Sequence, residues 1–94
     1  MTGTMRIRVN LLGTEVRLKQ EVFLDLSSSD PKDVLRALRD HCGASLERFM
    51  REDLSPVEGC TILVNGRNIE SLGLGEEKIQ DGDEVTFTVV VAGG

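Results

Sequence analysis

The residues at the end of the chain are the ones whose types could do chemistry. The sequence closes with Ala92-Gly93-Gly94, which carry a single methyl side chain between them, and an apolar segment at residues 84–91 precedes them. A C-terminal carboxylate ordinarily has a pKa of about 3.3–3.7, so at neutral pH it is ionised and resists nucleophiles until a leaving group is attached. Glycine places no Cβ beside the reacting carbon and leaves the backbone free to turn. We therefore expect Gly94 to be the reacting residue and Gly93 to give the tail its flexibility.

The reach of such a tail depends on where the strand before it ends. If the strand fills residues 84–91, the three remaining residues span about 10 Å at ~3.3 Å per residue. If pairing ends at Val89, five residues remain and span about 16 Å. We predict one domain over residues 1–94, with a flexible tail at residues 92–94.

Composition and charge exclude several classes of protein. The 94 residues carry a net charge of −5, and only 3% of them are aromatic. Nucleic-acid binders use basic surfaces and aromatic platforms, so we expect no nucleic-acid partner. No apolar run approaches the ~18 residues of a membrane span, and the polar first five residues do not resemble a signal peptide, so we expect no membrane association and a cytoplasmic location. An acidic chain of this kind would dock onto a basic groove of another protein.

The chain has few side chains that could form a metal or catalytic site. Cys42 and Cys60 lie apart from any C-x-x-C pair, so we expect no metal and no bound cofactor. A disulfide between them is disfavoured in a reducing cytoplasm, and we expect two reduced, mostly buried thiols. His41 is the only histidine, and the sequence indicates no Ser-His-Asp or Cys-His arrangement around it. We expect a carrier protein on which enzymes act, and not an enzyme.

The hydrophobic pattern indicates which elements position the tail. Apolar residues alternate with polar ones over residues 5–12 and 15–26, on either side of a Gly13-Thr14 turn, which predicts a β-hairpin. Asp30 and Pro31 are typical of a helix start, and apolar residues recur at helical spacing up to Cys42. Gly43 would end this helix, and a second helical stretch is predicted over residues 44–53.

The second half of the chain reads mainly as strands. Residues 60–64 form a short buried strand, Asn65-Gly66 is the strongest tight-turn signal, and residues 67–69 would pair back. A polar connection at residues 70–78 follows, then Ile79 as a core residue and a turn at residues 80–83. The terminal strand is predicted over residues 84–91.

This order of elements predicts an α+β fold. A hairpin, a crossing helix and further strands form a mixed sheet of four to five strands with one main helix packed on one face. The first and last strands would lie side by side and parallel at the centre of the sheet. This arrangement is the β-grasp, or ubiquitin-like, fold.

Three motifs in this order resemble a known family. They are Val64-Asn65-Gly66-Arg67, then Asp81-Gly82-Asp83-Glu84-Val85, and the terminal Gly93-Gly94. Their spacing, over essentially the whole chain, resembles the ubiquitin-like sulfur-carrier family, which includes the small subunit of molybdopterin synthase and the thiamine sulfur carrier. The chain departs from the molybdopterin members at Val89-Val90-Val91, where those members commonly have prolines.

The resemblance implies a mechanism and a set of partners. An E1-like enzyme would adenylate Gly94 with ATP, and a persulfide sulfur donor would displace AMP and leave a thiocarboxylate. The sulfur would pass to a precursor held by a recipient synthase subunit. We expect molybdenum cofactor biosynthesis as the route, with thiamine or another thiolation pathway as alternatives. ATP would be bound by the activating enzyme and not by this chain.

Two other classes of function remain open on the sequence. The chain could be a ubiquitin-like modifier that is conjugated through Gly94 to target lysines, or a β-grasp interaction domain without terminal chemistry. For partner docking we expect the exposed face of the sheet, with outward-pointing candidates at Arg6, Arg8, Thr86 and Thr88 and with Phe87 in the core. The acidic group Asp81, Asp83 and Glu84 is either a second docking patch or a solvated turn.

Overall fold

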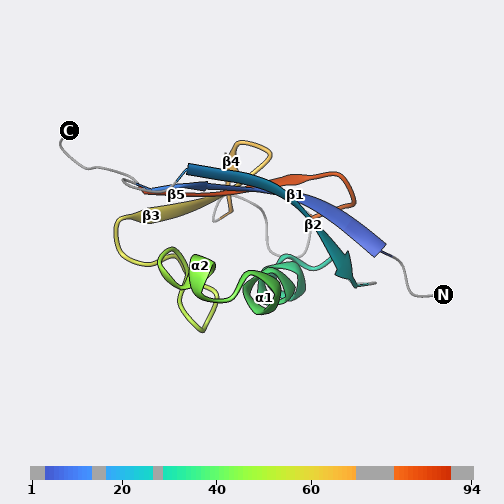
Figure 1. Ribbon diagram of the computed structural model, residues 1–94, viewed down its shortest axis with the longest axis horizontal. Coiled ribbons are helices and arrows are strands. Elements are labelled where there is room, and N and C mark those ends of the chain that lie inside the picture. Colours follow the sequence, from blue (N-terminus) through green and yellow to red (C-terminus); the bar gives the residue numbers. More distant parts are fainter. Residues whose placement is uncertain (1–3, 14–16, 27–28, 70–77, 90–94) are drawn as a thin grey trace.

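The fold is a five-stranded sheet with two helices on one face (Figure 1). The computed structural model describes residues 4–13, 17–26, 29–69 and 78–89. The elements, in chain order, are β1 (Thr4–Leu12), β2 (Arg17–Asp25), α1 (Pro31–Cys42), α2 (Ala44–Glu47), β3 (Cys60–Val64), β4 (Arg67–Asn68) and β5 (Glu84–Val89). The predicted β-grasp architecture is confirmed.

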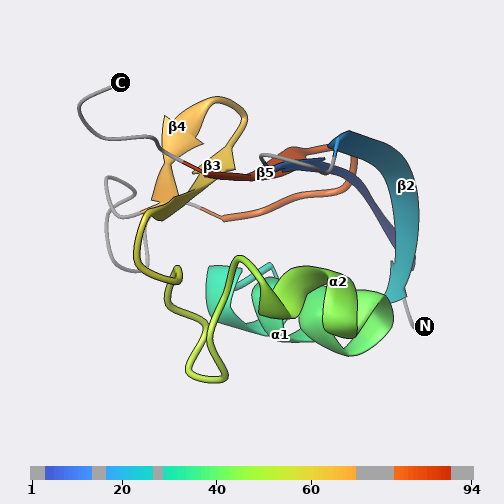
Figure 2. The same cartoon turned by 60° about the vertical axis from the view of Figure 1, so that its left-hand side comes forward.

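The strand order β2-β1-β5-β3-β4 places the first and last strands together at the centre of the sheet. β1 and β5 run parallel, with Val9 opposite Val85 and Leu12 opposite Thr88. β2 and β3 pair with them antiparallel on either side. Figure 2 shows β5 between β1 and β3, with the helices below the same face as in Figure 1. The strand that leads to the C-terminus is therefore paired on both edges.

The core lies between the sheet and the helices, and strand alternation selects its residues. In β1 the residues Met5, Ile7, Val9 and Leu11 are buried, while Arg6 and Arg8 are exposed. Phe87, Ile62 and Ile79 are fully buried in the same core, as expected for Phe87 and Ile79. The opposite face of the sheet, here called the open face, carries the alternate residues of each strand. The sequence alternation thus determines which face can meet a partner.

α1 begins and ends where the sequence predicts. The Asp30 carboxylate accepts a hydrogen bond from the Lys32 amide at 2.9 Å, and Pro31 occupies the first turn, where no amide donor is needed. The helix buries Val34, Leu35 and Leu38 against the sheet. Gly43 ends it at a positive φ of 59°, a conformation that glycine adopts without the steric cost of a Cβ.

The predicted second helix over residues 44–53 is wrong in length. α2 covers only Ala44–Glu47, and the chain then turns so that Met50 forms an isolated bridge with Pro56. The Arg51 amide donates to the Ser55 carbonyl oxygen at 2.8 Å, closing a loop in place of another helical turn. Leu46, Phe49 and Met50 are nevertheless buried. Their helix-like spacing reflects burial on one side of a compact loop.

The Asn65-Gly66 turn fastens the β3–β4 hairpin to β5. Both residues have positive φ, 52° and 84°, as a type I′ turn requires. Asn65 also bonds twice to Glu84: its side-chain oxygen accepts from the Glu84 amide at 2.9 Å, and its own amide donates to the Glu84 carbonyl at 2.8 Å. The turn therefore positions the first residue of the tail-bearing strand. β4 is shorter than predicted, since it ends at Asn68.

Substitution of Asn65 should separate its two contributions. We expect Asn65→Ala to lower the free energy of unfolding by about 1–3 kcal/mol. The substitution removes the hydrogen bond between the Asn65 side chain and the Glu84 amide, and alanine adopts positive φ less readily than asparagine. Asn65→Gly removes the bond but keeps the backbone conformation accessible, so it should cost less than Asn65→Ala. Denaturant unfolding of the two variants measures the difference. Equal losses would show that the backbone conformation contributes nothing.

Candidate functional site

The root of the tail lies at the rim of the sheet. In the described part of the chain β5 ends at Val89, which is opposite Cys60 of β3. The preceding residue, Thr88, lies between Leu12 of β1 and Thr61 of β3. The predicted site residues Gly93 and Gly94, and the predicted strand residues Val90 and Val91, lie outside the described residues. The structure therefore places the root of the tail and the surface around it.

The open face around this root is organised in rows that cross the strands. The row nearest the tail consists of Arg17, Leu12, Thr88 and Thr61. The next row consists of Lys19, Asn10, Thr86, Leu63 and Asn68. A third row, farther from the tail, contains Glu21, Arg8 and Glu84, and a fourth contains Phe23 and Arg6. The first two rows are therefore the described part of the open face that lies nearest the root of the tail.

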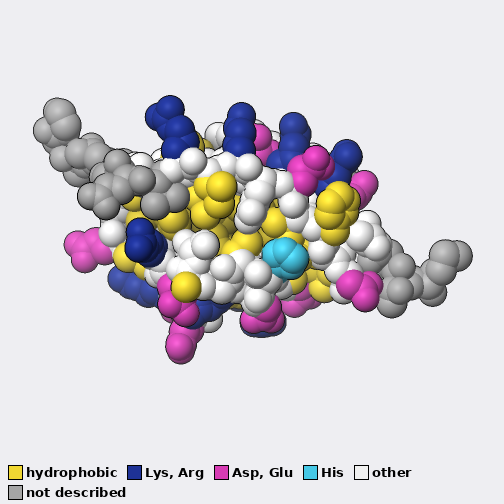
Figure 3. Space-filling model, in the orientation of Figure 1, with side chains coloured by type: hydrophobic (Ala, Val, Ile, Leu, Met, Phe, Trp, Pro, Cys, Tyr) yellow, Lys and Arg dark blue, Asp and Glu magenta, His cyan; other side chains and the backbone are white. Residues whose placement is uncertain are grey.

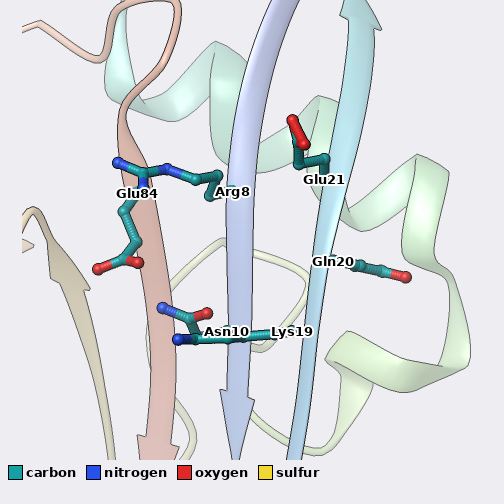
Figure 4. A pocket seen from close by; sticks show the side chains of 6 residues that line it. All are labelled: Arg8, Asn10, Lys19, Gln20, Glu21 and Glu84. Atoms are coloured by element: carbon teal, nitrogen blue, oxygen red, sulfur yellow. The ribbon is translucent and has the colours of Figure 1, made fainter.

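A shallow depression of about 370 Å³ lies in this face, and Figure 4 shows its lining side chains on β5, β1 and β2. Asn10 forms its floor and is only 7% exposed. The Asn10 amide nitrogen donates to the Thr86 hydroxyl at 3.0 Å, while its carbonyl oxygen accepts no hydrogen bond from the described residues. Arg8 and Lys19, with Glu21 and Glu84, are its charged lining residues. The depression thus places the carbonyl oxygen of Asn10 among two cations and two carboxylates.

Thr86 has a structural role, which the sequence-based docking prediction missed. It points to the open face as predicted, but it is only 8% exposed and its hydroxyl already accepts the hydrogen bond from Asn10. We expect Thr86→Val to lower the free energy of unfolding by about 1–3 kcal/mol, because the valine keeps the shape but leaves the buried Asn10 amide without its acceptor. Thr88→Val, at the half-buried neighbouring position, serves as the control and should change stability by less. Thermal or urea unfolding that ranks the two variants in the reverse order would contradict this role.

The other docking candidates differ in their availability. Arg6 is half-exposed and pairs loosely with Glu21, with 3.7 Å between Nε and Oε2. Arg8 reaches back toward the Gly82 carbonyl oxygen at 3.4 Å. Sequence reasoning missed Arg17 and Lys19, which stand opposite Leu12 and Asn10 and share their face. The odd-numbered positions of the second predicted strand were the signal that could have identified both residues.

The acidic turn is a structural element of the sheet. The Asp81 carboxylate accepts from the Arg6 amide at 2.6 Å, and the Asp83 carboxylate accepts from the Gln80 amide at 2.8 Å. The Gly82 amide also donates to the Arg6 carbonyl oxygen at 2.7 Å. These bonds extend the β1–β5 pairing at the end of the sheet away from the tail. Of the two predicted interpretations, the geometry favours the solvated turn.

Both cysteines are free thiols in different environments. Burial raises the pKa of the Cys42 thiol, although a hydrogen bond from Gln20 acts in the opposite direction. Burial also raises the pKa of the Cys60 thiol, whose sulfur donates toward the Arg48 carbonyl oxygen at 3.8 Å. A raised pKa keeps a thiol protonated at neutral pH, so neither sulfur is activated as a nucleophile.

Among the described residues, no three His, Cys, Asp or Glu side chains lie close enough together to hold a metal ion. His41 is exposed in the last turn of α1. In the same described ranges, neither helix has the length and apolar character needed to cross a membrane.

The chain is similar to known proteins in sequence and in structure. The model of the ThiS family matches residues 9–94. The crystal structure of SAMP1 from Haloferax volcanii is 27% identical, with a TM-score of 0.63 over 95% of this chain and 99% of that one. The solution structure of the HVO 2177 protein of the same organism is 25% identical, with a TM-score of 0.57 over 98% and 89%.

A more distant similarity shows the fold alone. The solution structure of Urm1 from Trypanosoma brucei is 19% identical, with a TM-score of 0.54 over the full length of both chains. A comparison with curated protein sequences gives no match.

Proposed function

Since this chain belongs to the ThiS family, we propose that it is a sulfur carrier whose terminal residue, Gly94, is adenylated by an E1-like enzyme and then converted to a thiocarboxylate. The family and SAMP1 assign the chain a sulfur-carrier or ubiquitin-like role. The reacting group, the partners and the route are the finer parts of the proposal. The molybdenum cofactor route is the first candidate, and a thiamine or other thiolation route is the alternative.

The proposed chemistry proceeds in balanced steps. The Gly94 carboxylate attacks the α-phosphorus of ATP, so that a mixed anhydride forms and pyrophosphate leaves. A persulfide sulfur of the donor then attacks the acyl carbon, and AMP leaves with the electrons of the C–O bond. A second thiol attacks the donor sulfur of the resulting S–S bond. The two thiol groups end as a disulfide, and the carrier departs as the thiocarboxylate. The thiocarboxylate sulfur then attacks an electrophilic carbon of the recipient, whose oxygen leaving group departs, and water hydrolyses the resulting thioester, so that the sulfur stays on the recipient and the carboxylate is regenerated.

One observation carries the proposal: the strand before the tail is held on both edges up to the rim of the sheet. β5 pairs with β1 and β3 as far as Thr88, and with β3 at Val89. The five residues from Val90 to Gly94 can span about 16 Å from that fixed root. A fixed root lowers the entropic cost of presenting the terminal carboxylate to a buried ATP site on another protein.

The proposal is tested by intact-mass spectrometry. The purified chain is incubated with the E1-like enzyme of the same organism, ATP and a persulfide-loaded sulfurtransferase. We expect a product heavier by about 16 Da, the difference between sulfur and oxygen, and no product when ATP is omitted. An unchanged mass with an activating enzyme that adenylates another carrier in parallel would refute the sulfur-carrier proposal.

A ubiquitin-like modifier is the second candidate, favoured by one similarity. The crystal structure of SAMP1, at 27% identity, supports a ubiquitin-like role as well as a sulfur-carrier role. In that case Gly94 would form an isopeptide bond with a lysine of a target protein. Conjugates of higher mass in cells that express a tagged chain, lost on removal of the final glycine, would identify this function.

A further inference from the structure

The charges on the open face are divided between its two halves. Among the described residues of the two rows nearest the tail, the charged side chains are Arg17 and Lys19, and none is a carboxylate. In the rows farther away, the cations Arg6 and Arg8 alternate with Glu21 and Glu84. The face that surrounds the root of the tail is therefore basic, although the whole chain has a net charge of −5.

Neither Arg17 nor Lys19 is neutralised within the described residues. Arg6 pairs with Glu21, and Arg8 bonds to the Gly82 carbonyl, but within the described ranges no ion pair or hydrogen bond involves the side chains of Arg17 and Lys19. Both residues are exposed, and both lie on β2, the edge strand of the sheet. Charges without internal partners remain available for an ion pair with another molecule.

The same two rows contain two apolar side chains, Leu12 and Leu63. Leu12 stands directly opposite Arg17 on the solvent-facing side of β1, and it is 37% exposed although its side chain is apolar. Leu63 lies in the same row as Lys19 but three strands along, beyond Asn10 and Thr86, and is half-buried. We call Arg17, Lys19, Leu12 and Leu63 the tail-side patch. Apolar residues bordered by charges are typical of a protein-binding surface, whose centre is apolar and whose rim is polar.

The opposite layer of the molecule has different electrostatics. Residues 29–59, which include both helices, contain more carboxylates than cations. Figure 3 shows a row of Lys and Arg side chains along the side of the sheet, with some Asp and Glu side chains among them, and both kinds of charge on the side of the helices. The net charge of the chain predicted docking onto a basic groove, whereas the described charges nearest the root of the tail are the cations Arg17 and Lys19.

We propose that the tail-side patch docks onto an acidic surface of the activating enzyme, with carboxylates opposite Arg17 and Lys19 and an apolar contact opposite Leu12. The inference rests on the proposed function, because it assumes that such an enzyme takes up the tail. A hydrogen-bond donor of that enzyme would occupy the depression and reach the open acceptor of Asn10. The charge pairs orient the carrier during encounter, and the apolar contact excludes water once the tail has entered.

The test compares two double variants that change the net charge equally. Arg17→Glu with Lys19→Glu reverses the tail-side patch, and Arg48→Glu with Arg51→Glu reverses two exposed cations of the helical layer. All four side chains are exposed, so both variants should melt within a few degrees of the wild type. The measurement is the dissociation constant of each chain for the E1-like enzyme of the same organism, by calorimetry without ATP.

We expect the patch variant to bind about tenfold to 100-fold more weakly at low salt, and the helical-layer variant to bind within about threefold of the wild type. The difference should shrink at about 0.5 M salt, where the screening length falls below ~5 Å. Equal losses in both variants, or no loss in the patch variant, would overturn the inference, as would a wild-type chain that does not bind. Because this assay needs no reaction at Gly94, wild-type binding without thiocarboxylate formation would refute the proposed function and leave the docking result standing.

Discussion

A chain that lacks Gly93 and Gly94 is expected to fold like the wild type and to yield no thiocarboxylate. The deletion moves the terminal carboxylate back by two residues, or about 7 Å, which takes it out of reach of the α-phosphorus in an ATP site shaped for the full tail. Misplacement of a reacting group by about 1 Å can already slow a reaction about 100-fold. Intact-mass spectrometry after incubation with the activating enzyme, ATP and a persulfide donor measures the loss.

The substitution Gly94→Ala refines the same prediction. It keeps the length of the tail but places a methyl group on the residue that bears the reacting carboxyl, and we expect adenylation at least about 100-fold slower. Unfolding curves of both variants should superimpose on that of the wild type, which separates loss of reactivity from loss of structure. Adenylation at the wild-type rate in either variant would mean that the diglycine is not the reacting end.

The largest loss of stability is expected from Phe87→Ala. Phe87 is fully buried in the central strand β5, between Leu11 and Ile62 in the sheet register, and its ring centroid lies 6.4 Å from that of Phe49. Truncation of a buried phenylalanine costs about 3–5 kcal/mol, against a total stability of about 5–15 kcal/mol for a domain of this kind. The melting temperature should fall by roughly 12–40 °C.

The exposed Phe23 provides a matched control for this substitution. It lies on β2 and is 61% exposed, so Phe23→Ala removes the same atoms from a side chain that is mostly in water. We expect its unfolding free energy to change by no more than about 0.5 kcal/mol. Comparable losses in the two variants, measured by thermal unfolding, would contradict the placement of Phe87 at the centre of the core.

Local patterns were enough to predict most of the fold. Alternation placed Ile7 and Val9 in the core and Arg6 and Arg8 outside, and the Asn65-Gly66 pair specified its turn, because both signals depend on near neighbours. The helical spacing after Gly43 misled the prediction, since Phe49 and Met50 are buried by a loop that a Met50–Pro56 bridge closes. A contact between residues on two sides of a loop leaves no periodic signal in the sequence.

The sequence by itself determined the order of the strands along the chain, the faces of those strands, and a terminus of two glycines after the last strand. These features follow from residue type and from periods of two or 3.6 residues. Only the tertiary structure decided that the Thr86 hydroxyl accepts a hydrogen bond from Asn10, and that Arg17 and Lys19 lie in the two rows nearest the root of the tail. The reason is physical: the register between strands that are distant in the sequence determines which charges become neighbours, so an acidic chain can present a basic face.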